Sequence, residues 1–280
     1  MTPFFFGDSK RPLFGALSEP PVASQRQHGV LLCPPIGQEH VRAHWAFRQL
    51  ATALARDGFH VLRFDWFGVG DSSGTLEDAT LDHFVEDAAT AASELRDMTG
   101  IRRVSAVGLR LGAAFAALAA ADIDPYRIVY WDPVVDGAAY FQRLSRLQRE
   151  ILVDPKRFWW AWPMPARELL AKVRPRSAQR RQSGTDEIVG FRVPASLRRA
   201  LESISPDQAV PANRSRLSIV SSRDDDGHAA LVTAFEAAGV SFEKREVAVD
   251  ARWDDASQIE QLLLPGETTK TIVSLLSRNT

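Results

Sequence analysis

The sequence has a single cysteine, Cys33, among its 280 residues. One thiol cannot form an internal disulfide or a metal site built from several thiolates, so disulfide-stabilised scaffolds and cysteine-rich zinc modules are excluded. Nowhere does the chain reach the roughly 18 consecutive apolar residues that a membrane-spanning helix needs. Its first residues, 1–8, also lack the basic segment and apolar core of a secretion signal. We therefore expect a cytoplasmic protein with no transmembrane segment.

Neither sign of charge is in excess, because 34 lysines and arginines stand against 35 aspartates and glutamates. This balance gives no overall field that would attract a polyanion, which argues against nucleic acid as a partner. The charges are nevertheless unevenly distributed. Residues 143–199 hold 14 basic and 5 acidic side chains, which leaves 20 basic and 30 acidic ones in the remainder. The pattern predicts a basic insertion on an acidic body, with a solvated surface as its simplest interpretation.

Short β-rich runs alternate with segments of helical periodicity, in a chain long enough to bury one sizeable core. Apolar residues at Phe47, Leu50, Ala51 and Leu54 have the spacing of a helix face. Such alternation predicts an α/β fold, a mostly parallel central sheet flanked by helices, with ligands at the carboxyl ends of the strands. The predicted strands are 30–33, 60–64, 104–107, 128–131, 217–221 and 243–249, preceded by an antiparallel edge hairpin over 4–6 and 13–17.

The alternation stops between about Gly137 and Ser205, where no clear strand can be recognised. We expect residues 1–136 and 206–280 to form the core and residues 137–205 to form a helical cap insertion. The insertion contains an aromatic cluster at residues 158–162, which fits the core of the cap, an acyl tunnel or a docking patch.

Four motifs occur in an order that resembles one known family. They are Cys-Pro-Pro-Ile-Gly-Gln-Glu-His at 33–40, a Gly-Val-Gly-Asp-Ser-Ser-Gly stretch at 68–74, Gly-Leu-Arg-Leu-Gly at 108–112 and Trp-Asp-Pro-Val-Val-Asp-Gly at 131–137. The sequence resembles the α/β-hydrolase superfamily and, within it, the serine-aminopeptidase-like group. That group includes exosortase-system-associated hydrolases and hydrolase-like proteins encoded beside bacterial biosynthetic genes. The resemblance covers most of the chain and implies the α/β-hydrolase fold with a cap.

The resemblance places residues 108–112 at the nucleophile elbow, a sharp strand-to-helix turn whose apex carries the catalytic serine. Here the apex residue is Arg110, while Gly108 and Gly112 keep the turn. A guanidinium stays protonated and has no lone pair with which to attack an acyl carbon, so serine-type covalent catalysis is excluded at this position. Arg110 is instead suited to hold a carboxylate or phosphate.

The other members of the expected triad are also incomplete. The family's histidine follows the last strand, yet residues 249–257 contain Trp253 and no histidine. The acidic member follows the preceding strand, where Asp225 lies in an aspartate-rich stretch, so an acid can survive without its partners. His228 is a candidate for a displaced base, but its sequence context favours the start of a helix.

The resemblance also implies an oxyanion hole made by the backbone N–H of Leu111 and that of Ile36 or Gly37. Glu39 and His40 follow this loop and can reach the mouth of the pocket. The candidate ligand-binding residues are Ile36, Gly37, Leu111, Asp225 and Trp253.

We expect Arg110 to pair with an acidic residue, Glu39 in the first place and Asp132 in the second. Asp132 ends the predicted strand 128–131, so its side chain overlooks the same pocket. A Glu39–Arg110 pair would act as a structural clamp or as a positioned acid–base pair. Cys33 has the context of a buried small hydrophobe, and Ser72 and Ser73 have that of a turn.

Three functions remain open from the sequence. The favoured one is non-covalent acid–base chemistry on an acyl or acyl-thioester biosynthetic intermediate, by elimination, cyclisation or water-mediated hydrolysis. Its catalytic candidates are Glu39, His40, Arg110 and Asp132. The second is an inactive pseudo-hydrolase that binds a ligand or a protein, and the third is a hydrolase with a relocated nucleophile such as Cys33. We expect no cofactor and no metal. The expected partner is a small acyl or carboxylate-bearing molecule, free or on a carrier protein, and a homodimer is compatible with the sequence.

Overall fold

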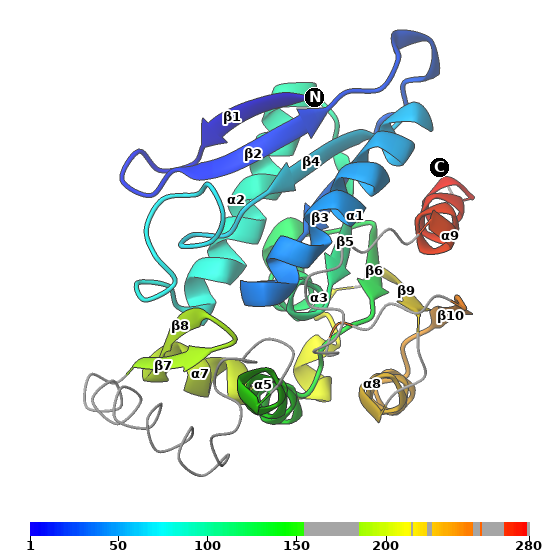
Figure 1. Cartoon of the computed structure of the whole chain (residues 1–280). Helices are drawn as coiled ribbons and strands as arrows, with labels where there is room; N and C mark the ends of the chain where they lie inside the picture. The colour runs from blue at the N-terminus through cyan, green and yellow to red at the C-terminus, as the bar shows by residue number, and fades with distance from the viewer. Residues whose placement is uncertain (154–184, 214, 223–225, 249–252, 254–265, 279–280) are drawn as a thin grey trace.

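A computed structural model describes residues 1–153, 185–213, 215–222, 226–248, 253 and 266–278. Its centre is an eight-stranded sheet in the order β1-β2-β4-β3-β5-β6-β9-β10 (Figure 1). Strands β1 (Thr2–Phe6) and β2 (Leu13–Ser18) form an antiparallel hairpin at one edge, and β2 pairs antiparallel with β4. The edge hairpin expected from the sequence is therefore confirmed.

The other six strands run parallel, as the alternation of strand and helix predicts. They are β3 (His28–Cys33), β4 (His60–Phe64), β5 (Arg103–Leu109), β6 (Arg127–Trp131), β9 (Arg216–Ser221) and β10 (Phe242–Glu246). Each coincides with a predicted strand to within a few residues at its ends. The last predicted strand extended to residue 249, which lies outside the described residues.

Helices cover both faces of the sheet (Figure 1). On one face, α1 (Gly37–Arg56) and α9 (Gly266–Ser277) pack on alternate residues of the strands, such as Val30 and Val107. On the other face, α2 (Leu81–Thr99), α3 (Leu111–Leu118) and α8 (Asp226–Ala237) pack on the intervening residues. Two short turns of helix, α4 (Ala120–Ile123) and η3 (Pro206–Ala209), add buried residues to the core, while a third, η1 (Val22–Ser24), lies at the surface.

Local sequence explains the buried face of α1 and both ends of α2. Helix α1 buries the apolar stripe that its spacing predicted. At the start of α2 the Thr80 hydroxyl accepts a hydrogen bond from the His83 N–H, which satisfies one of the free donors of a helix N-terminus. Its end is marked by Gly100 in the left-handed conformation at φ 70°. Among the described helices, none is long and apolar enough to cross a bilayer.

The insertion lies at the carboxyl ends of the strands and contains α5 (Gly137–Val153) and α7 (Ala195–Glu202) (Figure 1). It also contains an antiparallel hairpin, β7 (Thr185–Ile188) and β8 (Phe191–Pro194), in a segment for which no strand was expected. The turn between them is Val189-Gly190, both with positive φ. Such hairpin turns usually carry Asn-Gly or Asp-Gly, so the usual sequence signal is absent here. The aromatic cluster at 158–162 lies outside the described residues.

Candidate functional site

The site begins at the sharp turn between β5 and α3, whose apex is Arg110. Arg110 has φ 55° and ψ −124°, a conformation that non-glycine residues rarely adopt. The turn depends on the glycines on either side. A Cβ atom on Gly112 would lie 2.2 Å from the Cys33 carbonyl oxygen, and one on Gly108 would lie 2.3 Å from the Ala113 Cα. The close approach of the first turn of α3 to the end of β3 therefore requires glycine.

The side chain of Arg110 is bound from two directions. Its Nε donates to Glu39 Oε1 at 3.0 Å, and its Nη1 donates to the backbone carbonyl of Asp132 at 3.1 Å. Glu39 lies in the first turn of α1 and accepts a second hydrogen bond on Oε2 from the Tyr140 hydroxyl at 3.1 Å. The Tyr140 ring also lies under the guanidinium, 5.9 Å from its Cζ. The three side chains form one buried cluster that joins the sheet, α1 and the cap helix α5.

The charges within this cluster compensate one another. Burial opposes the charge of the Arg110 guanidinium, but Glu39, Tyr140 and Asp132 together outweigh this effect and the pKa of Arg110 is raised. Burial, together with the negative charge of Glu39, holds the pKa of Tyr140 well above its usual value. Arg110 therefore stays a cation and Tyr140 stays a neutral hydrogen-bond donor across the physiological range of pH.

Asp132 forms a second cluster directly beside the first. It has φ 40°, and its buried carboxylate accepts three hydrogen bonds. Oδ1 accepts from the Ser222 N–H at 2.6 Å, while Oδ2 accepts from the Ser222 hydroxyl at 2.6 Å and from the Trp253 indole N–H at 3.0 Å. Arg42 Nη1 in turn donates to the Trp253 carbonyl at 2.7 Å. The carboxylate is thus fixed by donors from the end of β9 and from the segment after β10.

The model of one protein family, described as serine aminopeptidase S33, matches residues 37–220, well over half of the chain. The chain belongs to this family. No curated protein matches the sequence significantly. The matched residues include Glu39, Arg110, Asp132 and Tyr140, so the first cluster lies entirely within the part that defines the family membership.

Solved structures similar to this family member share its whole fold. Est1E from Butyrivibrio proteoclasticus, solved with ferulic acid, has 15% identity and a TM-score of 0.62, covering 98% of this chain and 100% of that one. The bottromycin epimerase BotH, solved with bottromycin A2, has 17% identity and a TM-score of 0.57, with 99% and 100% covered. Mouse α/β-hydrolase domain-containing protein 10 has 16% identity and a TM-score of 0.53, with both chains fully covered. At these identities the likeness shows the α/β-hydrolase fold alone.

The structure brings some of the predicted site residues together and leaves others apart. The predicted Arg110–Glu39 ion pair is present, whereas Asp132 reaches Arg110 only through its backbone carbonyl. His40 lies outside the cluster, with Nε2 at 3.5 Å from Asp65 Oδ1.

The remaining candidates are divided between the loop, the helices and the part of the chain that is not described. Ile36 caps α1, Gly37 begins it with φ 62°, and Leu111 begins α3, so two helix N-termini point to this edge of the sheet. Asp225 lies outside the described residues. His228 lies in the first turns of α8, as its context predicted.

Cys33 and the serine pair have the structural positions expected of them. Cys33 is fully buried, and burial raises the pKa of its thiol. The Ser72 hydroxyl donates to the Asp65 carbonyl within a turn. Among the described residues, no group of three or more histidine, cysteine, aspartate or glutamate side chains is arranged to hold a metal ion.

Two residues of the site had no signal in the sequence. Tyr140 lies 101 residues from its partner Glu39, and Ser222 lies 90 residues from Asp132. Their roles depend on how the cap and the end of β9 pack against α1 and β6. The only available signal for Tyr140 was its hydroxyl group, close to the start of the predicted cap.

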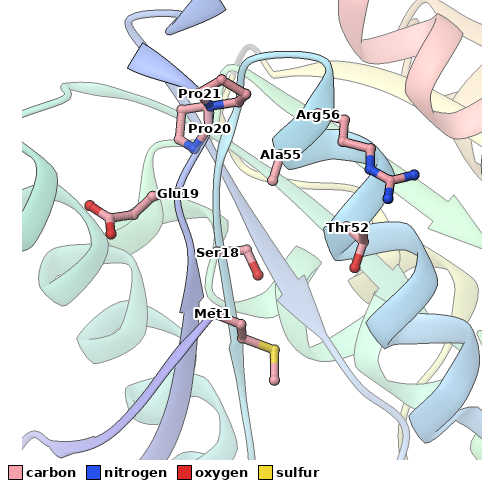
Figure 2. A pocket seen from close by; sticks show the side chains of 8 residues that line it. All are labelled: Met1, Ser18, Glu19, Pro20, Pro21, Thr52, Ala55 and Arg56. Carbon is pink, nitrogen blue, oxygen red and sulfur yellow. The ribbon is translucent and has the colours of Figure 1, made fainter.

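A cavity of about 420 Å³ lies elsewhere, between the end of β2 and the second half of α1 (Figure 2). Figure 2 shows Glu19 on one side of it and Thr52 and Arg56 on the other. None of its lining residues belongs to the clusters around Arg110 and Asp132. The cavity is therefore separate from the candidate site.

Proposed function

We propose that this protein is a non-hydrolytic member of its family that binds an acyl or carboxylate-bearing ligand through Arg110. The observation that carries the proposal is the position of Arg110 at the strand-to-helix turn, where α/β-hydrolases present their nucleophile. Its guanidinium is bound there by Glu39 and by the Asp132 carbonyl. The site is thus built around a fixed cation, which binds anions and cannot form an acyl-enzyme.

The neighbouring residues provide neither a general base nor a nucleophile in place of the missing histidine and serine. The Asp132 carboxylate is bonded to an indole N–H of Trp253, and an indole has no basic nitrogen that could accept a proton from a nucleophile. Cys33 is a poor substitute nucleophile, because burial raises the pKa of its thiol and leaves it protonated. These observations support binding over covalent hydrolysis, including hydrolysis by a relocated nucleophile.

The donors of Arg110 indicate which kind of ligand would fit. Nε and Nη1 are used by Glu39 and Asp132, and among the described residues no acceptor is bonded to Nη2. A ligand carboxylate or thioester carbonyl would accept a hydrogen bond from Nη2. Such a ligand would be free or attached to a carrier protein.

Acid–base catalysis is a second candidate, favoured by the 3.1 Å contact between the Tyr140 hydroxyl and Glu39 Oε2. A buried donor and acceptor in contact can relay a proton without a covalent intermediate. The similar structure of an epimerase is a precedent for such chemistry on this fold. It ranks second because both carboxylate oxygens of Glu39 are already occupied.

The first test of the proposal is covalent labelling with a fluorophosphonate probe, together with hydrolysis of p-nitrophenyl butyrate. We expect no labelling and no hydrolysis above the rate of buffer for the wild type. Arg110→Ser should behave in the same way, because Trp253 cannot act as the base. Stoichiometric labelling mapped to the site would refute the non-hydrolytic assignment.

The second test compares hexanoate with hexanamide, its uncharged analogue, by titration calorimetry. We expect hexanoate to bind more tightly than hexanamide and the difference to disappear in Arg110→Met. Arg127→Met is the matched control, because it removes another buried guanidinium at the far end of the sheet. Equal binding of both compounds, or equal loss in both variants, would refute Arg110 as the anchor. Release of a new product from an acyl-thioester would favour acid–base catalysis over binding.

A further inference from the structure

The amino ends of the central strands carry a row of three arginines and one histidine, at the edge opposite to the cap. Strand β3 begins with His28, β5 with Arg103, β6 with Arg127 and β9 with Arg216. The register pairs His28 with Arg103 and Arg127 with Arg216. Adjacent parallel strands lie about 4.8 Å apart, so the row places several positive groups along one short line.

Tyr126 holds two of these arginines in place. The Cζ of Arg103 lies 4.5 Å from the centre of its ring, and that of Arg216 lies 4.7 Å from it. Both arginines are exposed, and neither has an ion pair with a carboxylate among the described residues. Guanidinium groups stacked on an aromatic ring keep their N–H donors directed outward, which prepares them for a carboxylate.

The row is poorly neutralised by its neighbours. Arg127 is buried, donates to Ser218 Oγ at 2.6 Å and lies 3.7 Å from Glu243. Glu243 is also shared with Arg245 and with Arg278, so one carboxylate serves three guanidiniums. Burial, followed by the charges of Arg103, Arg26 and Arg127, lowers the pKa of His28 to about 4. Burial is the larger cause, and the arginines add to it in the direction expected of nearby positive charge.

We propose that Arg103, Tyr126 and Arg216 form a docking surface, the amino-edge surface, for an acidic segment of a partner protein. The carboxylates of such a segment fit guanidinium forks bidentately. The acidic character of the rest of the chain favours a short segment as the partner. Outside residues 143–199 the chain has 20 basic and 30 acidic residues, so a long polyanion such as nucleic acid would be repelled on either side of the row. The surface is independent of the Arg110 site and of its proposed ligand.

The test uses a fluorescein-labelled peptide of alternating glutamate and serine, with the same peptide carrying glutamine as the uncharged probe. Binding to the full chain is measured by fluorescence anisotropy at low and at physiological salt. We expect only the glutamate peptide to bind, and salt to weaken it. The variant Arg103→Gln/Arg216→Gln should reduce the affinity about tenfold or more, because two charge-assisted contacts are lost. Tyr126→Leu keeps both charges and should also weaken binding, since the arginines lose their support.

The matched control is Arg149→Gln/Arg199→Gln, which removes two exposed arginines from the cap helices. It should change the affinity by less than twofold, and melting temperatures should confirm that every variant is folded. An equal loss in the two double variants would show non-specific attraction and overturn the proposal. The assignment to an acidic protein segment would also be overturned in three other cases. These are equally tight binding of single-stranded DNA through the same arginines, displacement by inorganic phosphate beyond its effect on ionic strength, and self-association that disappears in Arg103→Gln/Arg216→Gln.

Discussion

Arg110 Nε lies 3.0 Å from Glu39 Oε1, and the two residues are only 5% and 2% exposed. An isolated charge in such a place would cost several kcal/mol, whereas the pair and its hydrogen bonds offset much of that cost. The apex of the turn and the first turn of α1 are therefore held together by electrostatics at the point where the fold offers a reaction centre.

The elbow should tolerate no side chain at position 112. Gly112→Ala would place a Cβ 2.2 Å and 2.4 Å from the Cys33 and Pro34 carbonyl oxygens, which are backbone atoms and cannot rotate away. We expect a loss of about 3 kcal/mol or more in the free energy of unfolding, as for other overpacked or strained sites. Gly266→Ala is the control, because no atom lies within 4 Å of its Cβ. Urea denaturation distinguishes the two, and equal stability would contradict the described approach of α3 to β3.

The carboxylate of Asp132 should be required as an acceptor on both oxygens. Asp132→Asn replaces one acceptor by an amide donor that would face the N–H or hydroxyl of Ser222 or the indole N–H of Trp253. We expect the free energy of unfolding to fall by about 2–3 kcal/mol. Ser222→Ala removes one of the three donors and should cost about 1 kcal/mol. An Asp132→Asn protein as stable as the wild type would show that this network is not formed.

Asp87 should make the stability depend on pH. Burial, the largest effect, raises the pKa of this carboxyl from 3.8 to about 6 in the folded protein. A raised pKa means that the folded state binds the proton more tightly. The contribution of Asp87 to stability is thus fully present below pH 3.8 and is lost as the pH rises through 6.

Asp87→Asn keeps an acceptor for the Phe67 N–H but cannot ionise. The stability of the variant should therefore rise relative to wild type by on the order of 2–3 kcal/mol between pH 4 and pH 7. Asp97→Asn, on the exposed side of the same helix, is the control and should follow the wild-type profile. Parallel profiles for wild type and Asp87→Asn would contradict the raised pKa. Urea unfolding at each pH gives the required values.

Most of the sheet could be predicted from the sequence because its strands are short apolar runs between helical segments. The runs at 60–64 and 128–131 are buried on both faces, which leaves little ambiguity about their conformation. The hairpin at β7 and β8 could not be predicted, since each strand has four residues and the turn is Val189-Gly190. Local sequence carries almost no signal for so short a pair.

The candidate site was predictable only where its residues follow a motif. Arg110 directly follows a recognisable strand and Glu39 lies in the first turn of the helix after another, and parallel strands bring such positions to one edge. Tyr140 contacts Glu39 across 101 residues of sequence, and Ser222 contacts Asp132 across 90. Such contacts depend on the packing of the cap and of β9, which no local pattern describes.

The coupling between Arg110 and Glu39 can be measured with a double-mutant cycle. We would measure the free energy of unfolding for wild type, Arg110→Met, Glu39→Gln and the double variant by urea denaturation. Each single change should cost about 3–5 kcal/mol, because it leaves a buried charge without its partner. The double variant should be more stable than the sum of the two losses by about 1–3 kcal/mol.

The same cycle on Lys270 and Glu267, an exposed pair on α9, provides the control and should show no measurable coupling. We expect clear coupling between Arg110 and Glu39 and none at the exposed pair. Strictly additive losses for Arg110→Met and Glu39→Gln would contradict this expectation, because they would mean that the two residues do not act as one buried unit.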